Sequence, residues 1–162
     1  MEGAHAAEKN LEGCEIIDFD LASPVDPAVV DRIAACPWNA GVHLAFELRD
    51  GGHFSAGDRL VVAIVDGEIQ AFATLAAAGA ILGDARGPWV GFVYCWPEAR
   101  GHGLTKAVVS RSCELAHEAE NGSVFVASAR DSLGLYRACG FEEREAAQAP
   151  WGEEIVVCER TL

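Results

Sequence analysis

The chain has few basic residues. Its 162 residues include 12 Lys and Arg against 25 Asp and Glu, which gives a formal net charge of −13. Proteins that bind nucleic acids or anionic lipids obtain much of their affinity from Lys and Arg side chains that neutralise phosphates. We therefore expect no nucleic-acid partner and no membrane partner. An acidic surface favours solubility, and it would also suit a cationic substrate such as an amine.

The sequence also lacks long hydrophobic runs and targeting signals. No stretch approaches the ~18 uncharged apolar residues that a membrane span needs. The N-terminal residues, Met1-Glu2-Gly3-Ala4-His5, lack the basic and then apolar pattern of a signal peptide. We expect a cytoplasmic protein, either a monomer or a homodimer.

No C-x-x-C pair is present among the six cysteines, which are dispersed along the chain. We expect reduced thiols in the core rather than disulfides. Cys113 and His117 stand four residues apart on one predicted helix face and could supply half of a zinc site. Because the sequence has no second close Cys/His pair, we expect no metal site.

The length suits a single domain, residues 1–162, with polar and frayed residues at 1–13. Apolar patterns between proline and glycine breaks predict its strands and helices. The predicted strands span residues 16–21, 59–65, 68–75, 89–96, 123–129, 141–144 and 153–160. The predicted helices span residues 27–35, 40–49 and 103–119, with a short fourth helix around Tyr136. In the second helix Val42, Leu44, Ala45 and Leu48 form the apolar side.

Two of these strands have the composition of central strands. Residues 89–96 are an unbroken apolar run, and residues 123–129 follow after one helix, which is typical of neighbouring parallel strands. Asp66-Gly67 joins the strands at 59–65 and 68–75 in a tight antiparallel hairpin. The sum is a three-layer α/β domain of the α+β type, with one mixed sheet between helices on both faces.

The most informative stretch, residues 96–105, lies between the apolar run and the third helix. It reads Trp-Pro-Glu-Ala-Arg-Gly-His-Gly-Leu-Thr. The first turn of a helix has unpaired N–H groups and the positive end of the helix dipole, so Gly101 and Gly103 would let a pyrophosphate approach closely. The stretch is neither a P-loop nor a dinucleotide fingerprint, because Lys106 stands where the latter requires a third glycine. It therefore predicts a phosphate-binding turn of another kind.

A second motif, Leu135-Tyr136-Arg137-Ala138-Cys139-Gly140-Phe141, has the form of a short helix, a glycine cap and a new strand. R-G-x-G-L at a helix start, followed some thirty residues later by L-Y-x-x-x-G-F, resembles the GNAT superfamily of acyl-CoA-dependent N-acetyltransferases. The resemblance covers residues from about 59 to the C-terminus. It departs from the family pattern at Thr105, where the family prefers Gly or Ala, and at Ala129, where it often has Asn.

The resemblance implies acetyl-CoA as cosubstrate and a mostly antiparallel sheet that is splayed at two central parallel strands. The implied cofactor-binding residues are Val93, Tyr94, Cys95, Arg100, Gly101, His102, Gly103, Leu104 and Thr105. Tyr136 is the implied general acid for the departing thiolate, since a phenol near pKa 10 can usefully protonate it. The implied reaction is acetyl transfer to a primary amine of a small molecule or peptide by direct attack.

The general base stays open at this point. Some relatives use a glutamate where this chain has Val124. Glu47, Asp50, His43 and His53 come from the segment that lines the acceptor pocket in similar proteins, Tyr94 could also face the site, and solvent could suffice. A non-catalytic acyl-CoA-binding module and a transferase for a longer acyl-CoA are the alternative functions.

Overall fold

A computed structural model of the chain describes residues 4–6 and 13–162. The strands are β1 (Ala4–Ala6), β2 (Cys14–Asp20), β3 (Arg59–Val65), β4 (Glu68–Ala76), β5 (Trp89–Cys95), β6 (Ser123–Ser128), β7 (Glu142–Gln148) and β8 (Glu154–Thr161). The α-helices are α1 (Pro27–Ala34), α2 (Asn39–Asp50), α3 (Leu104–Glu118) and α4 (Leu133–Ala138), with 3-10 turns at Pro97–Ala99 and Arg130–Ser132.

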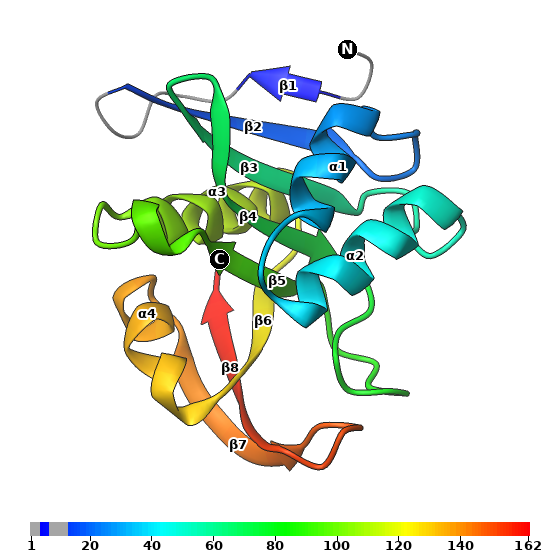
Figure 1. Ribbon diagram of the computed structural model, residues 1–162. Helices are drawn as coiled ribbons and strands as arrows, with labels where there is room; N and C mark the ends of the chain where they lie inside the picture. The colour runs from blue at the N-terminus through cyan, green and yellow to red at the C-terminus, as the bar shows by residue number, and fades with distance from the viewer. Residues whose placement is uncertain (1–3, 7–12) are drawn as a thin grey trace.

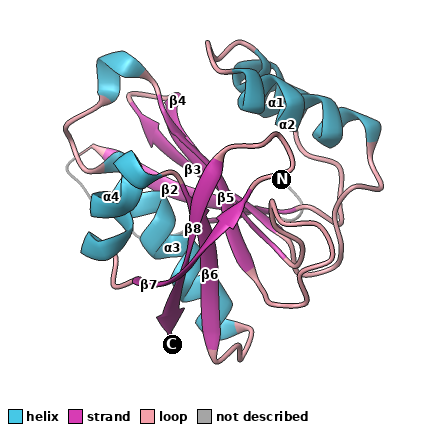
Figure 2. Cartoon of the chain, turned by 90° about the horizontal axis from the view of Figure 1, so that it is seen from below, coloured by secondary structure: helices cyan, strands magenta, loops and turns pink. Residues whose placement is uncertain are grey.

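The strands form one sheet in the order β1-β2-β3-β4-β5-β6-β8-β7. Every neighbouring pair is antiparallel except β5 and β6, which are parallel. Helices α1 and α2 cover one face, and α3 and α4 lie on the other (Figures 1 and 2). The predicted three-layer architecture with a mixed, mostly antiparallel sheet is confirmed.

Three details differ from the sequence-based expectations. Ala4–Ala6, predicted to be frayed, form an edge strand antiparallel to β2; residues 1–3 and 7–12 of the same segment lie outside the described residues. Val42, placed on the apolar side of α2, is 48% exposed, because Gly41, Leu44 and Ala45 provide the buried side. Strand β7 extends to residue 148, since its pairing with β8 continues through a polar stretch that has no apolar alternation.

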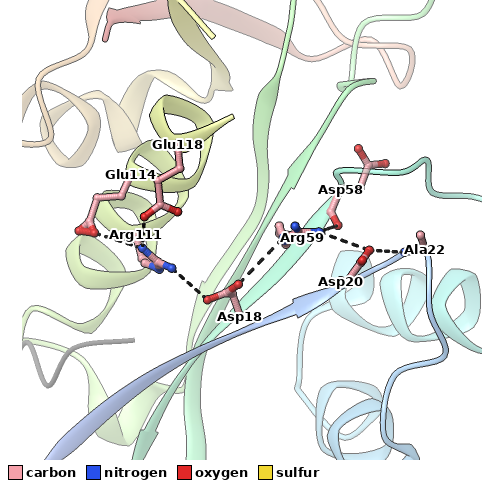
Figure 3. A network of polar contacts seen from close by, with 8 residues as sticks. All are labelled: Asp18, Asp20, Ala22, Asp58, Arg59, Arg111, Glu114 and Glu118. Atoms are coloured by element: carbon pink, nitrogen blue, oxygen red, sulfur yellow. Dashed lines mark hydrogen bonds and ion pairs between the residues drawn. The ribbon is translucent and has the colours of Figure 1, made fainter. Parts of the chain in front are cut away.

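A buried ion network fastens α3 to the sheet (Figure 3). The alternation of β2 turns Cys14, Ile16 and also Asp18 towards α3, and the Asp18 side chain is 1% exposed. Arg111 Nη2 of α3 lies 3.3 Å from Asp18 Oδ1, and Arg59 Nε of β3 lies 4.0 Å from Oδ2. A buried carboxylate between two guanidinium groups is compensated, which makes this aspartate tolerable inside the core.

The sheet opens between its two parallel strands. Only Trp89 and Val90 of β5 pair with β6, and beyond them the two strands separate. At its other edge, β5 pairs irregularly with β4, because two residues of β5, Phe92 and Val93, lie opposite the single residue Ala73 of β4. Phe92 has a φ of 48°, which is uncommon for a residue that is not glycine. This β-bulge bends β5 away from β6, and the predicted splay is confirmed.

Candidate active site at the splayed strands

A cavity of about 390 Å³ lies where β5 and β6 part. It is lined by nine of the ten predicted site residues: Val93, Tyr94, Cys95, Arg100, Gly101, Gly103, Leu104, Thr105 and Tyr136. The tenth, His102, is exposed and does not line the cavity. Residues from β5, the start of α3 and α4, far apart in the sequence, thus surround one space.

A larger cavity, about 580 Å³, lies at the other end of α3 and contains none of the predicted site residues. Its wall includes Arg59 and Arg86, but each of these arginines is paired with carboxylates. It therefore offers no unpaired positive charge to a phosphate, and the smaller cavity is the better candidate for the predicted chemistry.

The β5 wall of the cavity is a strand edge. Beyond Val90 the backbone of β5 has no ladder partner on the β6 side. The Cys95 carbonyl accepts a hydrogen bond from Arg100 Nε at 3.1 Å, and Trp96 N–H donates to the Gln70 carbonyl of β4 at 2.9 Å. The backbone of β5 beyond Val90 is therefore an open edge along the cavity, where an extended ligand can add as a strand does.

The turn between β5 and α3 depends on two glycines. Gly101 and Gly103 have φ values of 84° and 78°, in the left-handed region that favours glycine. The first helical bond of α3 runs from Ala107 N–H to the Gly103 carbonyl at 3.0 Å. The preceding N–H groups, from Leu104 onwards, consequently have no helical partner, and Leu104 is buried and fixes the helix start in the core. The helix terminus is therefore suited to an anion.

Arg100 brings an uncompensated positive charge to this turn. Eight of the ten arginines lie within 4 Å of a carboxylate, and within residues 4–6 and 13–162 only Arg100 and Arg160 do not. In a chain with twice as many acidic as basic residues, a cavity arginine without a carboxylate partner is unusual. Its guanidinium group stays available for a phosphate.

Tyr136 enters the cavity from α4. Gly140, with a φ of 90°, closes the helix, and the Phe141 N–H then donates to the Tyr136 carbonyl at 3.0 Å. The Phe141 ring packs edge-on against Tyr136, with centroids 5.8 Å apart. Burial raises the pKa of the Tyr136 hydroxyl well above its usual value, with a smaller contribution from the nearby thiols of Cys139 and Cys158. The L-Y-x-x-x-G-F motif thus fixes a buried, protonated phenol at the cavity.

The other titratable groups at the cavity are also held in their protonated forms. Burial raises the pKa of the Cys95 thiol, although Arg100 partly opposes this effect. Burial likewise raises the pKa of Tyr94, whose ring packs against Trp38, Phe72 and Trp96. A phenol with a raised pKa is a poor base, so the structure does not support Tyr94 in that role.

The four remaining candidate bases lie on α2 and in the loop that follows it. His53 Nδ1 lies 3.3 Å from Glu47 Oε2, and His53 Nε2 lies 2.8 Å from Asp50 Oδ2. His43 Nε2 lies 3.7 Å from Glu47 Oε1. None of them lines the cavity, and Val124, at the position of the relatives' glutamate, is fully buried.

Two cavity residues and one backbone feature were not predicted. Ser132 and Leu135 line the cavity beside Tyr136. Leu135 belongs to the second motif and could have been included on that basis, whereas the bulge at Phe92 has no sequence signal because no glycine marks its positive φ. Among the described residues, no group of three or more His, Cys, Asp and Glu side chains is arranged to hold a metal ion. All six cysteines are free and buried.

None of the helices described here is long and apolar enough to cross a bilayer. No curated protein matches the sequence significantly. Several solved structures share the fold. The crystal structure of Escherichia coli ElaA has a TM-score of 0.65 at 16% identity, covering 91% of this chain and 99% of that one. A GNAT family acetyltransferase from Elizabethkingia anophelis with acetyl-CoA bound has a TM-score of 0.65 at 12% identity, covering 93% and 99%.

An aminoglycoside 6′-N-acetyltransferase complexed with coenzyme A has a TM-score of 0.67 at 9% identity, covering 84% of this chain and 92% of that one. At such low identities these likenesses show the fold alone. The sequence itself provides the family, because the profile of the acetyltransferase (GNAT) family matches residues 28–141, more than half of the chain. That match includes both motifs that surround the cavity, and the chain belongs to the acetyltransferase (GNAT) family.

Proposed function

We propose that this protein transfers an acetyl group from acetyl-CoA to a primary amine of a small molecule or peptide, in the cytoplasm. The observation that carries the proposal is the single cavity that brings together an unpaired arginine, a glycine turn at a helix start and a buried phenol. The first two suit the pyrophosphate of the donor, and the third suits its sulfur.

The residues present fit acetyl-CoA in three places. Arg100 and the N–H groups at the start of α3 would hold the pyrophosphate, and the Thr105 hydroxyl would add a donor there. The unpaired edge of β5 would pair with the pantetheine arm. Acetyl-CoA supplies the activated acyl group, and a backbone N–H in the bulge near Phe92 would polarise its carbonyl.

The lining of the cavity favours direct attack over a covalent acyl-enzyme. Cys95 is the thiol that lines it, and the raised pKa keeps this thiol protonated and weakly nucleophilic. The amine nitrogen would therefore form its bond to the acyl carbon as the carbon–sulfur bond breaks. Tyr136 would give its proton to the departing sulfur, and the proton of the amine would pass to solvent.

A specific observation also favours the non-catalytic alternative. Of the described residues that line the cavity, none is Asp, Glu or His. The amine would have to arrive unprotonated or lose its proton to water. An acyl-CoA-binding module without turnover would share this lining, and a transferase for a longer acyl-CoA would differ only in the space available at the splay.

Release of free thiol from acetyl-CoA, measured over a panel of primary amines, tests the proposal. We expect amine-dependent release, and longer acyl donors should react more slowly. Tyr136→Phe keeps the ring and its contact with Phe141, so coenzyme A affinity should stay unchanged while kcat falls by roughly 10²–10⁴-fold. The loss should shrink with a donor whose thiol is more acidic. Binding of acetyl-CoA without release for any amine would support the non-catalytic module instead.

A further inference from the structure

Arg100 is held by an aromatic ring as well as by the backbone. Its guanidinium carbon lies 5.8 Å from the centroid of the Tyr94 ring, and its Nε donates to the Cys95 carbonyl. A guanidinium group over an aromatic face is attracted by the ring quadrupole, so the position of the Tyr94 ring affects where the charge of Arg100 lies.

The Tyr94 ring itself stacks on a second aromatic side chain, that of Trp38. The two rings are stacked, with centroids 5.2 Å apart and planes 9° apart. Phe72 and Trp96 complete the contacts of the Tyr94 ring at 5.7 and 5.3 Å. Trp38 precedes the first turn of α2 and does not line the cavity. The stack therefore connects the start of α2 with the residue that bears the positive charge of the cavity.

The first turn of α2 is fitted closely to this tryptophan. A Cβ added to Gly41 would lie 2.3 Å from Cys36 Sγ, 3.3 Å from Trp38 Cε3 and 3.4 Å from Phe72 Cζ. Only a glycine lets the helix backbone approach the rings this closely without displacing a neighbour. The first turn of α2 is consequently in close contact with the aromatic cluster that contains Trp38 and Phe72.

We propose that Trp38 is a positioning residue for coenzyme A, acting through Tyr94 on Arg100. This inference rests on the proposed function, because it assumes that the cavity takes a CoA thioester. The stack holds the Tyr94 ring, the ring holds the guanidinium group beside the turn, and the guanidinium group meets the pyrophosphate. Trp38 thus contributes to binding without touching the ligand.

The test measures coenzyme A dissociation constants by calorimetry for wild type, Trp38→Leu and Trp38→Phe. We expect Trp38→Leu to raise Kd about three- to tenfold, because binding must then order the less restrained Arg100 side chain, and Trp38→Phe to restore most of the affinity. Trp151→Leu is the matched control, because Trp151 is 66% exposed in the β7–β8 loop and is not part of the cavity lining. Its Kd should equal that of wild type.

Two further measurements separate positioning from a general loss of structure. Pantetheine lacks the pyrophosphate, so its affinity should not change in Trp38→Leu. In an Arg100→Met background, Trp38→Leu should have no further effect on coenzyme A. The inference would be overturned if Trp38→Leu weakened the binding of coenzyme A and pantetheine equally. It would also be overturned if Trp38→Leu weakened coenzyme A binding as much in the Arg100→Met background as in wild type.

Should Trp38→Leu fail to fold, Gly41→Ala disturbs the same packing with every ring retained, because its added methyl group would lie 2.3 Å from Cys36 Sγ and 3.3 Å from Trp38 Cε3. A Kd unchanged by Trp38→Leu and Gly41→Ala, but raised by Arg100→Met, would refute the role of Trp38 and leave the proposed function intact. A wild-type protein that binds no coenzyme A would refute the proposed function itself.

Discussion

Replacing Asp18 by Asn removes the central charge of the buried network between α3 and the sheet. The carboxylate is 1% exposed and lies 3.3 Å from Arg111 Nη2 and 4.0 Å from Arg59 Nε. Removing one partner of a buried ion pair typically costs about 3–5 kcal/mol, because the remaining charge is buried without compensation. Arg111 keeps Glu114 and Glu118 as exposed partners, at 3.5 and 3.3 Å, which lowers the expected loss. We therefore expect the free energy of unfolding to fall by about 2–4 kcal/mol.

Urea unfolding followed by circular dichroism measures this change in free energy. In thermal unfolding, the midpoint temperature should fall by roughly 5–15 °C. Asp31→Asn is the matched control. Asp31 forms a shorter ion pair, 2.7 Å from Arg49 Nη2, but its side chain is 71% exposed. Such pairs contribute about 0–1 kcal/mol. If the two substitutions destabilise the protein equally, burial does not determine the strength of these pairs, and the reasoning is wrong.

Three other predictions concern the turn and two buried acids. Gly103→Val places a β-branched residue at a φ of 78° in front of the α3 N–H groups, so the Kd for coenzyme A should rise at least about tenfold. Gly152→Val is the control for backbone strain, because Gly152 has a φ of 92° in the β7–β8 loop, and this variant should leave Kd unchanged. Burial raises the pKa of the Cys113 thiol from 9.0 to about 11, so the unfolded thiol ionises first, and the free energy of unfolding should fall by about 2 kcal/mol between pH 9 and 11. In Cys113→Ala, the free energy of unfolding measured with urea should fall less steeply with pH over that range. An identical slope in wild type and variant would contradict the raised pKa of Cys113. Because burial raises the pKa of Tyr136, its proton stays in place past pH 10, and kcat should show no alkaline loss from this residue below about pH 9.5; a loss there that disappears in Tyr136→Phe would contradict the raised pKa.

Most of the fold could be predicted because its elements have strong local signals. The hairpin at Asp66-Gly67 joins β3 and β4 as expected, with Asp66 and Gly67 both at positive φ. The unbroken apolar run became the central strand β5. The insertion of β8 between β6 and β7 had no such signal, because the order of strands depends on long-range pairing rather than on local pattern.

The site was predictable where its residues act through the backbone. Gly101, Gly103 and Gly140 each have a positive φ that only glycine adopts freely. Their positions in the sequence therefore predict where the backbone turns at the site. The bulge at Phe92, the Trp38–Tyr94 stack and the burial of Asp18 are tertiary contacts between ordinary residues. The sequence around Asp18 is the same whether its carboxylate faces water or pairs with Arg111. Local pattern therefore cannot distinguish an exposed aspartate in β2 from a buried one.

The charge of the whole chain leads to a last prediction about the rate of binding. Coenzyme A is strongly anionic, and the protein has a net charge of −13, so the two repel each other at long range. Salt screens this repulsion, since the Debye length falls from about 30 Å at 0.01 M to about 8 Å at 0.15 M. The attraction to Arg100 and the α3 N–H groups acts over a few ångströms and is screened much less.

We therefore expect the association rate constant for coenzyme A, measured by stopped flow, to rise severalfold between about 0.01 and 0.15 M salt. This is the opposite of the usual steering of a charged ligand by a complementary surface. Arg100→Met should mainly increase the dissociation rate, because it removes a local contact, and should leave the sign of the salt effect unchanged. An association rate constant that falls with salt would mean that the positive field at the cavity reaches beyond the acidic surface. In that case the local charge of Arg100 and α3, rather than the net charge, would govern the encounter with the donor.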